Sequence, residues 1–126
     1  MLIDTDVLIW YMRGNPRAAK VVERLADPAV SVVTYMELVQ GMRNKRELQA
    51  LRSTLQDWGA VILPLNETIS SKAMFYVEQY FHSHSLRLAD TLIGTTAVVN
   101  GLTLLTANTK HYGVIKDLSL ARFTPS

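Results

Sequence analysis

Short apolar runs alternate along the chain with longer stretches in which apolar residues recur at helical spacing. A brief apolar run bounded by polar or turn residues predicts a buried strand, whereas apolar residues at i, i+3, i+4 and i+7 predict an amphipathic helix. We therefore expect strands near residues 1–3, 30–33, 61–63, 102–105 and 118–121. We expect helices near residues 7–12, 16–26, 34–42, 48–59, 68–81, 88–99 and 109–112, with a polar loop at 82–85.

Several predicted helices carry recognisable boundary residues. Asn15 and Pro16 form a cap and a first helical residue, Asn66 caps a later helix, and Thr5 or Asp6 caps the first one. Alternation of short apolar strands with helices is typical of an α/β fold, with a short, mostly parallel β-sheet flanked by α-helices on both faces. The chain has 126 residues without repeats or a linker, so we expect one domain over residues 1–126.

Composition removes several classes of protein from consideration. Hydrophobic residues make up 48% and charged residues 19%, which excludes a disordered chain. The absence of cysteine excludes disulfides, thiolate catalysis and zinc-finger or iron–sulfur ligation. No apolar run approaches the roughly 20 residues of a membrane-spanning helix, and the opening residues lack the basic region of a signal peptide. We therefore expect a cytoplasmic protein that makes no contact with a membrane.

Oxygen-bearing side chains follow several of the predicted strands, where sites form in parallel α/β sheets. Asp4 and Asp6 come directly after the first strand, and Glu37 is expected in the first turn of the helix after the second. Asp90 is expected in the first turn of the helix at 88–99, and Asn108 lies three residues beyond the strand at 102–105. Four segments thus deliver oxygen ligands to one edge of the sheet.

Each of these acids also has a purely structural interpretation. Asp4 and Asp6 could end a strand and cap a helix, although a charge among apolar neighbours such as those of Asp4 is usually paired or bound to metal. Glu37 completes a capping box with Thr34 and faces away from the apolar stripe of its helix. Asp90 could be a first-turn acid favoured by the helix dipole. These interpretations stay open at the level of single residues.

Taken together, the acids indicate a metal site. Three carboxylates within about 5 Å would repel by roughly 3 kcal/mol per pair, so that protons, basic partners or metal ions must stabilise them. Oxygen ligands without cysteine suit Mg²⁺ or Mn²⁺. Four of the 11 acidic residues are in this set, against 13 Lys and Arg, so the remaining surface is basic and suits a nucleic-acid backbone. The candidate backbone contacts are Arg43, Lys45, Arg46, Arg87, Lys110 and Lys116.

Three sequence segments, in order, resemble one family over essentially the whole chain. They are MLIDTDVLIWYMRG, VSVVTYMELVQGM with its T-x-x-E-L context, and LRLADTLIGTTAVVNGLTLLTANTKHY with its T-x-N-x-x-H-[FY] ending. These segments are similar to the acidic motifs of PIN-domain ribonucleases, specifically the VapC-type toxins of bacterial and archaeal toxin–antitoxin pairs. The order and spacing of the three make the resemblance specific.

The resemblance implies roles for individual residues. It implies that Asp4, Glu37 and Asp90 are the core metal ligands and catalytic residues, and that Asp6 is a secondary acid. Thr5 and Thr106 would support them through hydrogen bonds. The fourth acidic position of the family falls on Asn108, whose amide offers an oxygen without a charge, so we expect one tightly held ion. His111 stands where relatives often carry Asp or His, and no role is assigned to it.

The resemblance also implies an activity and partners. It implies a Mg²⁺- or Mn²⁺-dependent endoribonuclease whose activated water attacks an RNA phosphodiester in line, leaving a 5′-phosphate and a 3′-hydroxyl. It implies a homodimer formed through helices near the N-terminal half. It further implies a cognate VapB-like antitoxin, a small DNA-binding protein whose C-terminal tail lies across the toxin groove and places a basic side chain in the acidic pocket.

Three alternatives remain at this stage. A haloacid-dehalogenase-type phosphatase would use Asp4-Thr5-Asp6 as its D-x-D motif, but the strand near 102–105 leads to Thr106-Ala107-Asn108 instead of an acid pair. A receiver-like switch domain needs an aspartate after its third strand, where this chain has Pro64. A catalytically inactive PIN scaffold that only binds partners is the third alternative.

Overall fold

The computed structural model describes residues 1–83 and 86–126. Its strands are β1 (Leu2–Ile3), β2 (Ala29–Ser31), β3 (Val61–Leu63), β4 (Leu104–Thr106) and β5 (Leu120–Arg122). Its helices are α1 (Thr5–Met12), α2 (Pro16–Glu23), α3 (Val32–Gln40), α4 (Lys45–Asp57), α5 (Glu67–Tyr80), the 3-10 helix η1 (Phe81–Ser83), α6 (Leu88–Val99) and α7 (Thr109–Tyr112). Of the loop predicted at 82–85, His82 and Ser83 belong to η1, and His84 and Ser85 lie outside the described residues.

The strands form one parallel sheet in the order β3-β2-β1-β4-β5, as predicted from the alternation of strands and helices. Leu2 of β1 is in register with Ala29 of β2 on one side and with Leu104 of β4 on the other. From β1 the chain continues to β2 on one side, and it returns to β4 on the other side only later. The carboxyl ends of β1 and β4 therefore form the switch point at which parallel sheets bind ligands.

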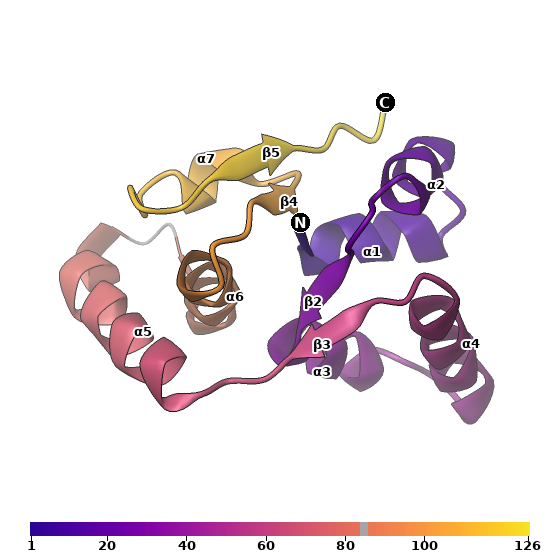
Figure 1. Cartoon of the computed structure of the whole chain (residues 1–126), viewed down its shortest axis with the longest axis horizontal. Coiled ribbons are helices and arrows are strands. Elements are labelled where there is room, and N and C mark those ends of the chain that lie inside the picture. The colour runs from indigo at the N-terminus through magenta and orange to yellow at the C-terminus, as the bar shows by residue number, and fades with distance from the viewer. Residues whose placement is uncertain (84–85) are drawn as a thin grey trace.

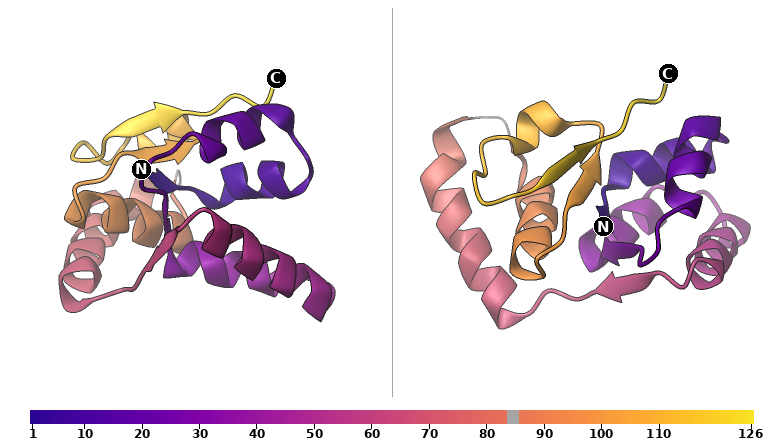
Figure 2. Two further views of the ribbon diagram at one scale, coloured as in Figure 1. Left: turned by 45° about the vertical axis from the view of Figure 1, so that its right-hand side comes forward. Right: turned by 45° about the horizontal axis from the view of Figure 1, so that its top comes forward.

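Helices cover both faces of the sheet, and each face has its own core. Successive residues of a strand point to opposite faces, so Ile3 and Leu105 join one apolar cluster while Leu2 and Leu104 join the other. The first cluster is completed by α1, α2, α3 and α4, and the second mainly by α5, α6 and α7. Figure 1 shows α5 and α6 on the left and α1, α2 and α4 on the right, and the views in Figure 2 agree.

Some predicted boundaries are wrong for identifiable reasons. The strand predicted at 30–33 ends at Ser31, because the Ser31 hydroxyl caps α3 by accepting from the Val33 amide at 3.1 Å. The strand predicted at 102–105 begins at Leu104, because the Leu102 amide still bonds to the Ala97 carbonyl and Gly101 turns the chain with φ +65°.

The helix ends differ by a few residues as well. The helix predicted at 16–26 ends at Glu23, and the helix predicted at 48–59 begins at Lys45, where the Asn44 side chain accepts from the Glu47 amide. Asp4, rather than Thr5 or Asp6, is the N-cap of α1. The caps predicted at Asn15 and Asn66 are confirmed. In the described ranges, no helix is long and apolar enough to cross a membrane.

Candidate metal centre

Asp4 is the buried centre of the network at the carboxyl end of β1. It is 4% exposed, and its two carboxylate oxygens accept three hydrogen bonds. The donors are the Thr5 amide at 2.8 Å, the Thr106 hydroxyl at 2.8 Å and the Tyr112 hydroxyl at 3.2 Å. Burial raises the pKa of Asp4 to about 7, and the nearby charge of Asp6 adds to this rise while the three donors lower it.

Asp6 lies in the first turn of α1, and both Asp6 and Asp4 accept a hydrogen bond from the Thr106 hydroxyl. Its Oδ2 accepts from the Ala107 amide at 3.1 Å and from the Thr106 hydroxyl at 3.4 Å. Its Oδ1 is buried without a hydrogen-bond partner in residues 1–83 and 86–126. Burial is the main cause that raises the pKa of Asp6. A buried carboxylate oxygen without a donor is costly, and it is the kind of atom that a cation would satisfy.

Glu37 reaches the network from α3 through Thr5. Because α3 begins at Val32, Glu37 lies in its second turn, and the predicted capping box with Thr34 is wrong. Glu37 Oε1 instead accepts from the Thr5 hydroxyl at 2.8 Å. That hydroxyl also shares a hydrogen bond of 3.0 Å with the hydroxyl of Thr34, which is fully buried. The structural interpretation that competed with a ligand role for Glu37 is therefore removed.

Asp90 lies in the first turn of α6, as predicted, and does two things at once. Its Oδ2 accepts from the Arg87 amide at 3.3 Å, so the structural interpretation as a helix-capping acid is realised. Its Oδ1 accepts from the Tyr112 hydroxyl at 3.5 Å. The Asp90 side chain is 21% exposed, so this carboxylate lies between the buried network and the surface.

Tyr112 is a member of the network that sequence reasoning missed. Its hydroxyl contacts both Asp4 and Asp90, and the residue is 1% exposed. The available signal was the aromatic residue that ends T-x-N-x-x-H-[FY]. An aromatic residue there reads as core, and nothing local to the sequence indicates that its hydroxyl points to two aspartates.

The structure thus brings Asp4, Asp6, Glu37 and Asp90 into one network of hydrogen bonds. The carboxylates do not converge on a single point, however. In the part of the chain that the structure describes, no three His, Cys, Asp or Glu side chains are grouped so that they could hold a metal ion as they stand. The Thr106 hydroxyl lies between the carboxylates of Asp4 and Asp6, and the Tyr112 hydroxyl lies between those of Asp4 and Asp90. Direct contact between unscreened carboxylates would cost several kcal/mol, which explains the intervening donors.

The donor set suits a hard divalent cation. Every candidate ligand is a carboxylate oxygen, and Asp6 Oδ1 has no donor within the described residues. Carboxylate and water oxygens are what Mg²⁺ and Mn²⁺ prefer. Asn108 is exposed and contributes its backbone amide, which donates to the Thr106 hydroxyl at 3.0 Å. The chemistry of the network therefore fits the ion that the sequence predicts, with Asp4 at its centre.

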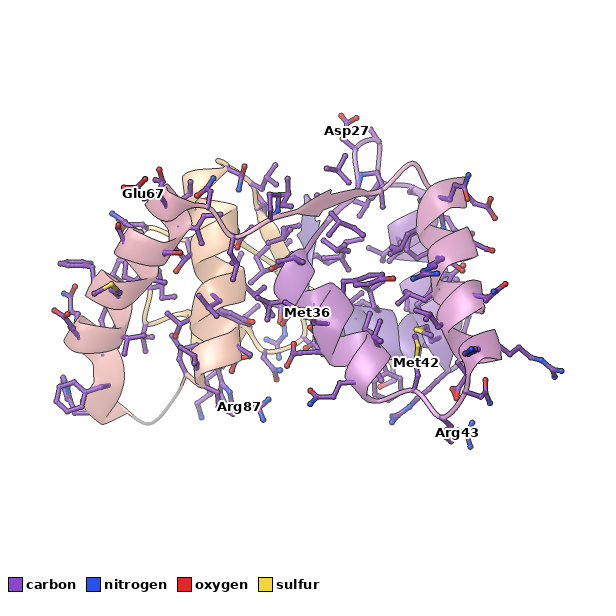
Figure 3. The ribbon with its side chains drawn as sticks, turned by 90° about the horizontal axis from the view of Figure 1, so that it is seen from below. Asp27, Met36, Met42, Arg43, Glu67 and Arg87 are labelled. Carbon is purple, nitrogen blue, oxygen red and sulfur yellow. The ribbon has the colours of Figure 1, made fainter. Side chains whose placement is uncertain are left out.

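A groove borders the network where Glu37 meets the surface. It encloses about 510 Å³ between α1, α3 and α4, and its lining includes Glu37, Met12, Met42 and Arg43. Arg43 is 87% exposed and pairs with Glu47 at 3.2 Å. Figure 3 shows Arg43 and Arg87 at one edge of the molecule, opposite Asp27 and Glu67. The other candidate backbone contacts, all exposed, are Lys45, Arg46, Lys110 and Lys116.

Comparison with known proteins adds the family context. Residues 1–116 match the family described as PIN domain. The chain is 36% identical over 124 residues to Ribonuclease VapC10 of Mycobacterium tuberculosis, covering 94% of this chain and 90% of that protein. It is 33% identical over 123 residues to Ribonuclease VapC19 of the same organism, covering 93% and 95%.

Solved structures have the same architecture. A chain of a toxin–antitoxin complex from Klebsiella pneumoniae superposes with a TM-score of 0.79 at 28% identity, covering 99% of this chain and 97% of that one. A chain of a DNA-bound VapBC complex from Salmonella typhimurium superposes with a TM-score of 0.83 at 16% identity, covering 96% of each chain, which supports the fold alone.

Proposed function

The chain belongs to the PIN-domain family, among the VapC-type members, and from this premise we propose that it is a metal-dependent endoribonuclease and the toxin of a type II toxin–antitoxin pair. The observation that carries the proposal is the burial of Asp4 beside Asp6 at the carboxyl end of the central strand. Two adjacent carboxylates with raised pKa values and one unsatisfied oxygen are costly to keep. Such an arrangement is typical of functional sites.

The candidate ligands are Asp4, Glu37 and Asp90, with Asp6 beside them. A bound Mg²⁺ or Mn²⁺ ion would supply a water of lowered pKa and would offset charge on the scissile phosphate. Thr106 and Thr5 fix the carboxylates of Asp4 and Glu37 through their hydroxyls. Because ligand orientation is set by such outer contacts, these threonines belong to the machinery that we propose.

The proposed reaction is hydrolysis of an RNA phosphodiester. The water oxygen bonds to phosphorus in line with the departing 3′ oxygen, which takes up a proton, and the products carry a 5′-phosphate and a 3′-hydroxyl. The exposed basic side chains bind the RNA backbone, with Arg43 beside the groove and Arg87 beside Asp90. A basic surface around an acidic site attracts the polyanion while leaving the ligands free for the cation.

We propose two protein partners. One is a VapB-like antitoxin, in keeping with the toxin–antitoxin complexes among the similar structures; its tail would cross the groove beside Glu37 and offer a cation to the carboxylates. The other is a second copy of the chain. The three most exposed large apolar side chains of the described residues are Phe81, Leu88 and Met74, on η1, α6 and α5. We place the dimer contact on these elements, whereas the resemblance to VapC-type toxins implies helices near the N-terminal half. We also propose that the protein works in the cytoplasm, beside its RNA substrates.

The alternatives are less well supported. A phosphatase that uses Asp4 as a nucleophile needs that carboxylate accessible, and Asp4 is 4% exposed with three hydrogen bonds. A receiver-like domain needs an acid after the third strand, where β3 is followed by Pro64. An inactive scaffold would keep the fold without cleavage, and the following experiment separates it from the nuclease.

The test is cleavage of a mixed transfer- and messenger-RNA pool by the purified, antitoxin-free protein. Reactions contain Mg²⁺, Mn²⁺ or a chelator, and Asp4→Asn is run in parallel. We expect cuts that need metal, leave 5′-phosphates and disappear in the variant, because the amide keeps the shape of the side chain while removing its charge. Far-ultraviolet circular dichroism checks that the variant is folded.

The outcomes are distinct. Full activity in folded Asp4→Asn, or cleavage unaffected by chelator, would exclude the proposed metal mechanism. Failure of a folded, metal-loaded wild-type protein to cut any RNA in the pool would favour the inactive scaffold. Hydrolysis of a phosphate monoester under the same conditions would favour the phosphatase.

A further inference from the structure

The side chain of Tyr112 lies between two segments that the sequence separates widely. It is the last residue of α7, and its ring belongs to the core cluster under α5, α6 and α7. A β-carbon placed on Gly94 of α6 would lie 3.5 Å from Cδ1 of this ring, so the helix passes close to it. Asp90 and Gly94 are four residues apart and therefore share a face of α6. The same face that receives the ring thus presents the carboxylate to its hydroxyl.

The hydroxyl of Tyr112 has two carboxylates within reach. Its oxygen lies 3.2 Å from Asp4 Oδ1 and 3.5 Å from Asp90 Oδ1. A phenol has a single proton to donate, so the two oxygens share it in a three-centre arrangement. Burial, followed by the charge of Asp4, raises the pKa of Tyr112 above its ordinary value, which keeps the group a neutral donor.

Packing alone does not require this hydroxyl. A phenylalanine would fill the same space against Gly94, and it would carry no polar atom into a site that is 1% exposed. A buried tyrosine is stable only where its hydroxyl finds a partner. The partners here are the carboxylate that ends β1 and the carboxylate that begins α6.

We propose that Tyr112 is a positioning residue whose hydroxyl keeps the carboxylates of Asp4 and Asp90 near each other in the metal-free protein, so that the proposed divalent cation can draw both into its ligand set. This inference rests on the proposed function and deepens it. Asp4 is fixed by two further donors, whereas the contact of Tyr112 is what ties Asp90 Oδ1 to the network. Loss of the Tyr112 hydroxyl should therefore weaken metal binding mainly because Asp90 Oδ1 loses its hydrogen bond to the network.

The test is Tyr112→Phe, with Tyr76→Phe as the matched control. Tyr76 is also buried, at 2% exposure, and its hydroxyl donates to the carboxylate of Asp117 at 2.7 Å, away from the network. Binding of Mn²⁺ is measured from the free-ion signal in electron paramagnetic resonance, and RNA cleavage is resolved into kcat and KM. Contacts that orient ligands are worth about tenfold or more in metal affinity. We expect Tyr112→Phe to raise the Kd for Mn²⁺ by about that factor and to lower kcat with KM unchanged, and Tyr76→Phe to change neither.

A change in the Kd for Mn²⁺ of less than about threefold in Tyr112→Phe, or an equal change in Tyr76→Phe, would overturn the inference. If the wild-type protein binds no Mn²⁺ at all, the proposed metal site fails, and crystal structures of the metal-free proteins decide the role of Tyr112 separately. Separation of the Asp90 and Asp4 carboxylates in Tyr112→Phe would support a positioning role. Unmoved carboxylates would reject it.

Discussion

Asp4 and Asp90 contribute to the same network under different physical conditions. Asp4 follows a strand in the centre of the sheet, is 4% exposed and accepts three hydrogen bonds. Asp90 begins a helix, its side chain is 21% exposed, and one of its oxygens serves the helix itself. Strand ends in a parallel sheet are fixed by neighbours on both sides, whereas the first turn of a helix is bordered by solvent. The comparison sets a buried carboxylate with three donors beside a partly exposed one with two.

Burial of the Asp4 carboxylate has a cost in folding free energy. Burial raises the pKa of Asp4 to about 7, so the metal-free protein keeps a proton there that the unfolded chain loses near its ordinary value of 3.8. The fold therefore carries a cost at Asp4 that a cation would relieve. Removal of the Asp4 carboxylate should therefore change stability in a way that depends on pH.

The largest expected effect is on the pH dependence of stability in chelator. Between about pH 4 and pH 7 the folded state binds more protons at Asp4 than the unfolded state, so the free energy of unfolding should fall as pH rises. The pKa difference corresponds to at most about 4 kcal/mol at 1.36 kcal/mol per pKa unit. Urea unfolding from pH 4.5 to 8 measures it, and Asp4→Asn should lose most of the slope.

The companion measurement uses Asp90→Asn, which should keep that slope because it leaves the buried carboxylate of Asp4 in place. Parallel curves for the wild type and Asp4→Asn would show that burial does not govern the titration of Asp4.

Added Mg²⁺ should stabilise the wild type more at pH 8 than at pH 5, since the ligands must lose protons to bind.

The next effect concerns RNA cleavage by Asp90→Asn. The amide keeps one acceptor oxygen, enough for either the Arg87 amide or the Tyr112 hydroxyl, and it removes a charge from the proposed ligand set. We expect the rate to fall by about 100-fold, the upper end of the range for contacts that only orient ligands. Single-turnover cleavage at saturating Mn²⁺ measures it. A rate equal to that of the wild type would restrict Asp90 to capping α6.

Thr5→Val should have a smaller effect on RNA cleavage. The variant tests whether the Thr5 hydroxyl positions Glu37 or only contributes to stability. The variant removes the donor to Glu37 Oε1 while keeping the shape of the side chain, and we expect about a tenfold loss of activity. Thr95→Val is the control, because the buried Thr95 hydroxyl donates to the Thr91 carbonyl one turn back within α6. Equal losses in the two variants would mean that Thr5 acts through packing.

The sequence predicts the places of the acidic residues in the fold more accurately than it predicts the hydrogen bonds between them. Asp4 and Asp6 lie at the carboxyl end of β1, where the strand pattern places them, and Asp90 lies in the first turn of the helix predicted at 88–99. Glu37 is in the network, but its predicted capping box is absent, because Ser31 caps α3 three residues earlier than the apolar pattern indicates. A helix start depends on which hydroxyl reaches a free amide, and several residues compete for that role.

Tyr112 illustrates what sequence patterns leave out. The short helix predicted at 109–112 is confirmed, and the aromatic ring of Tyr112 is buried. The direction of its hydroxyl depends on how closely α6 approaches at Gly94, which is a tertiary distance. Contacts between residues 4, 90 and 112 arise only when β1, α6 and α7 pack together, so local periodicity carries no signal for them.

The smallest expected effect is that of Arg43→Ala on RNA binding. Arg43 is 87% exposed at the groove beside Glu37, and its pairing with Glu47 is a surface ion pair that contributes little to stability. If Arg43 binds an RNA phosphate, Arg43→Ala should raise KM by a few fold, leave kcat unchanged, and reduce the slope of log affinity against log salt by about 0.7, the value for one contact to a single strand. Arg24→Ala, at the exposed end of α2, should change neither quantity. An unchanged salt slope in Arg43→Ala would remove this arginine from the RNA path. A fall in kcat would instead mean that Arg43 acts on the carboxylates of the proposed metal site. We do not expect this, because Arg43 is exposed whereas Asp4 is buried.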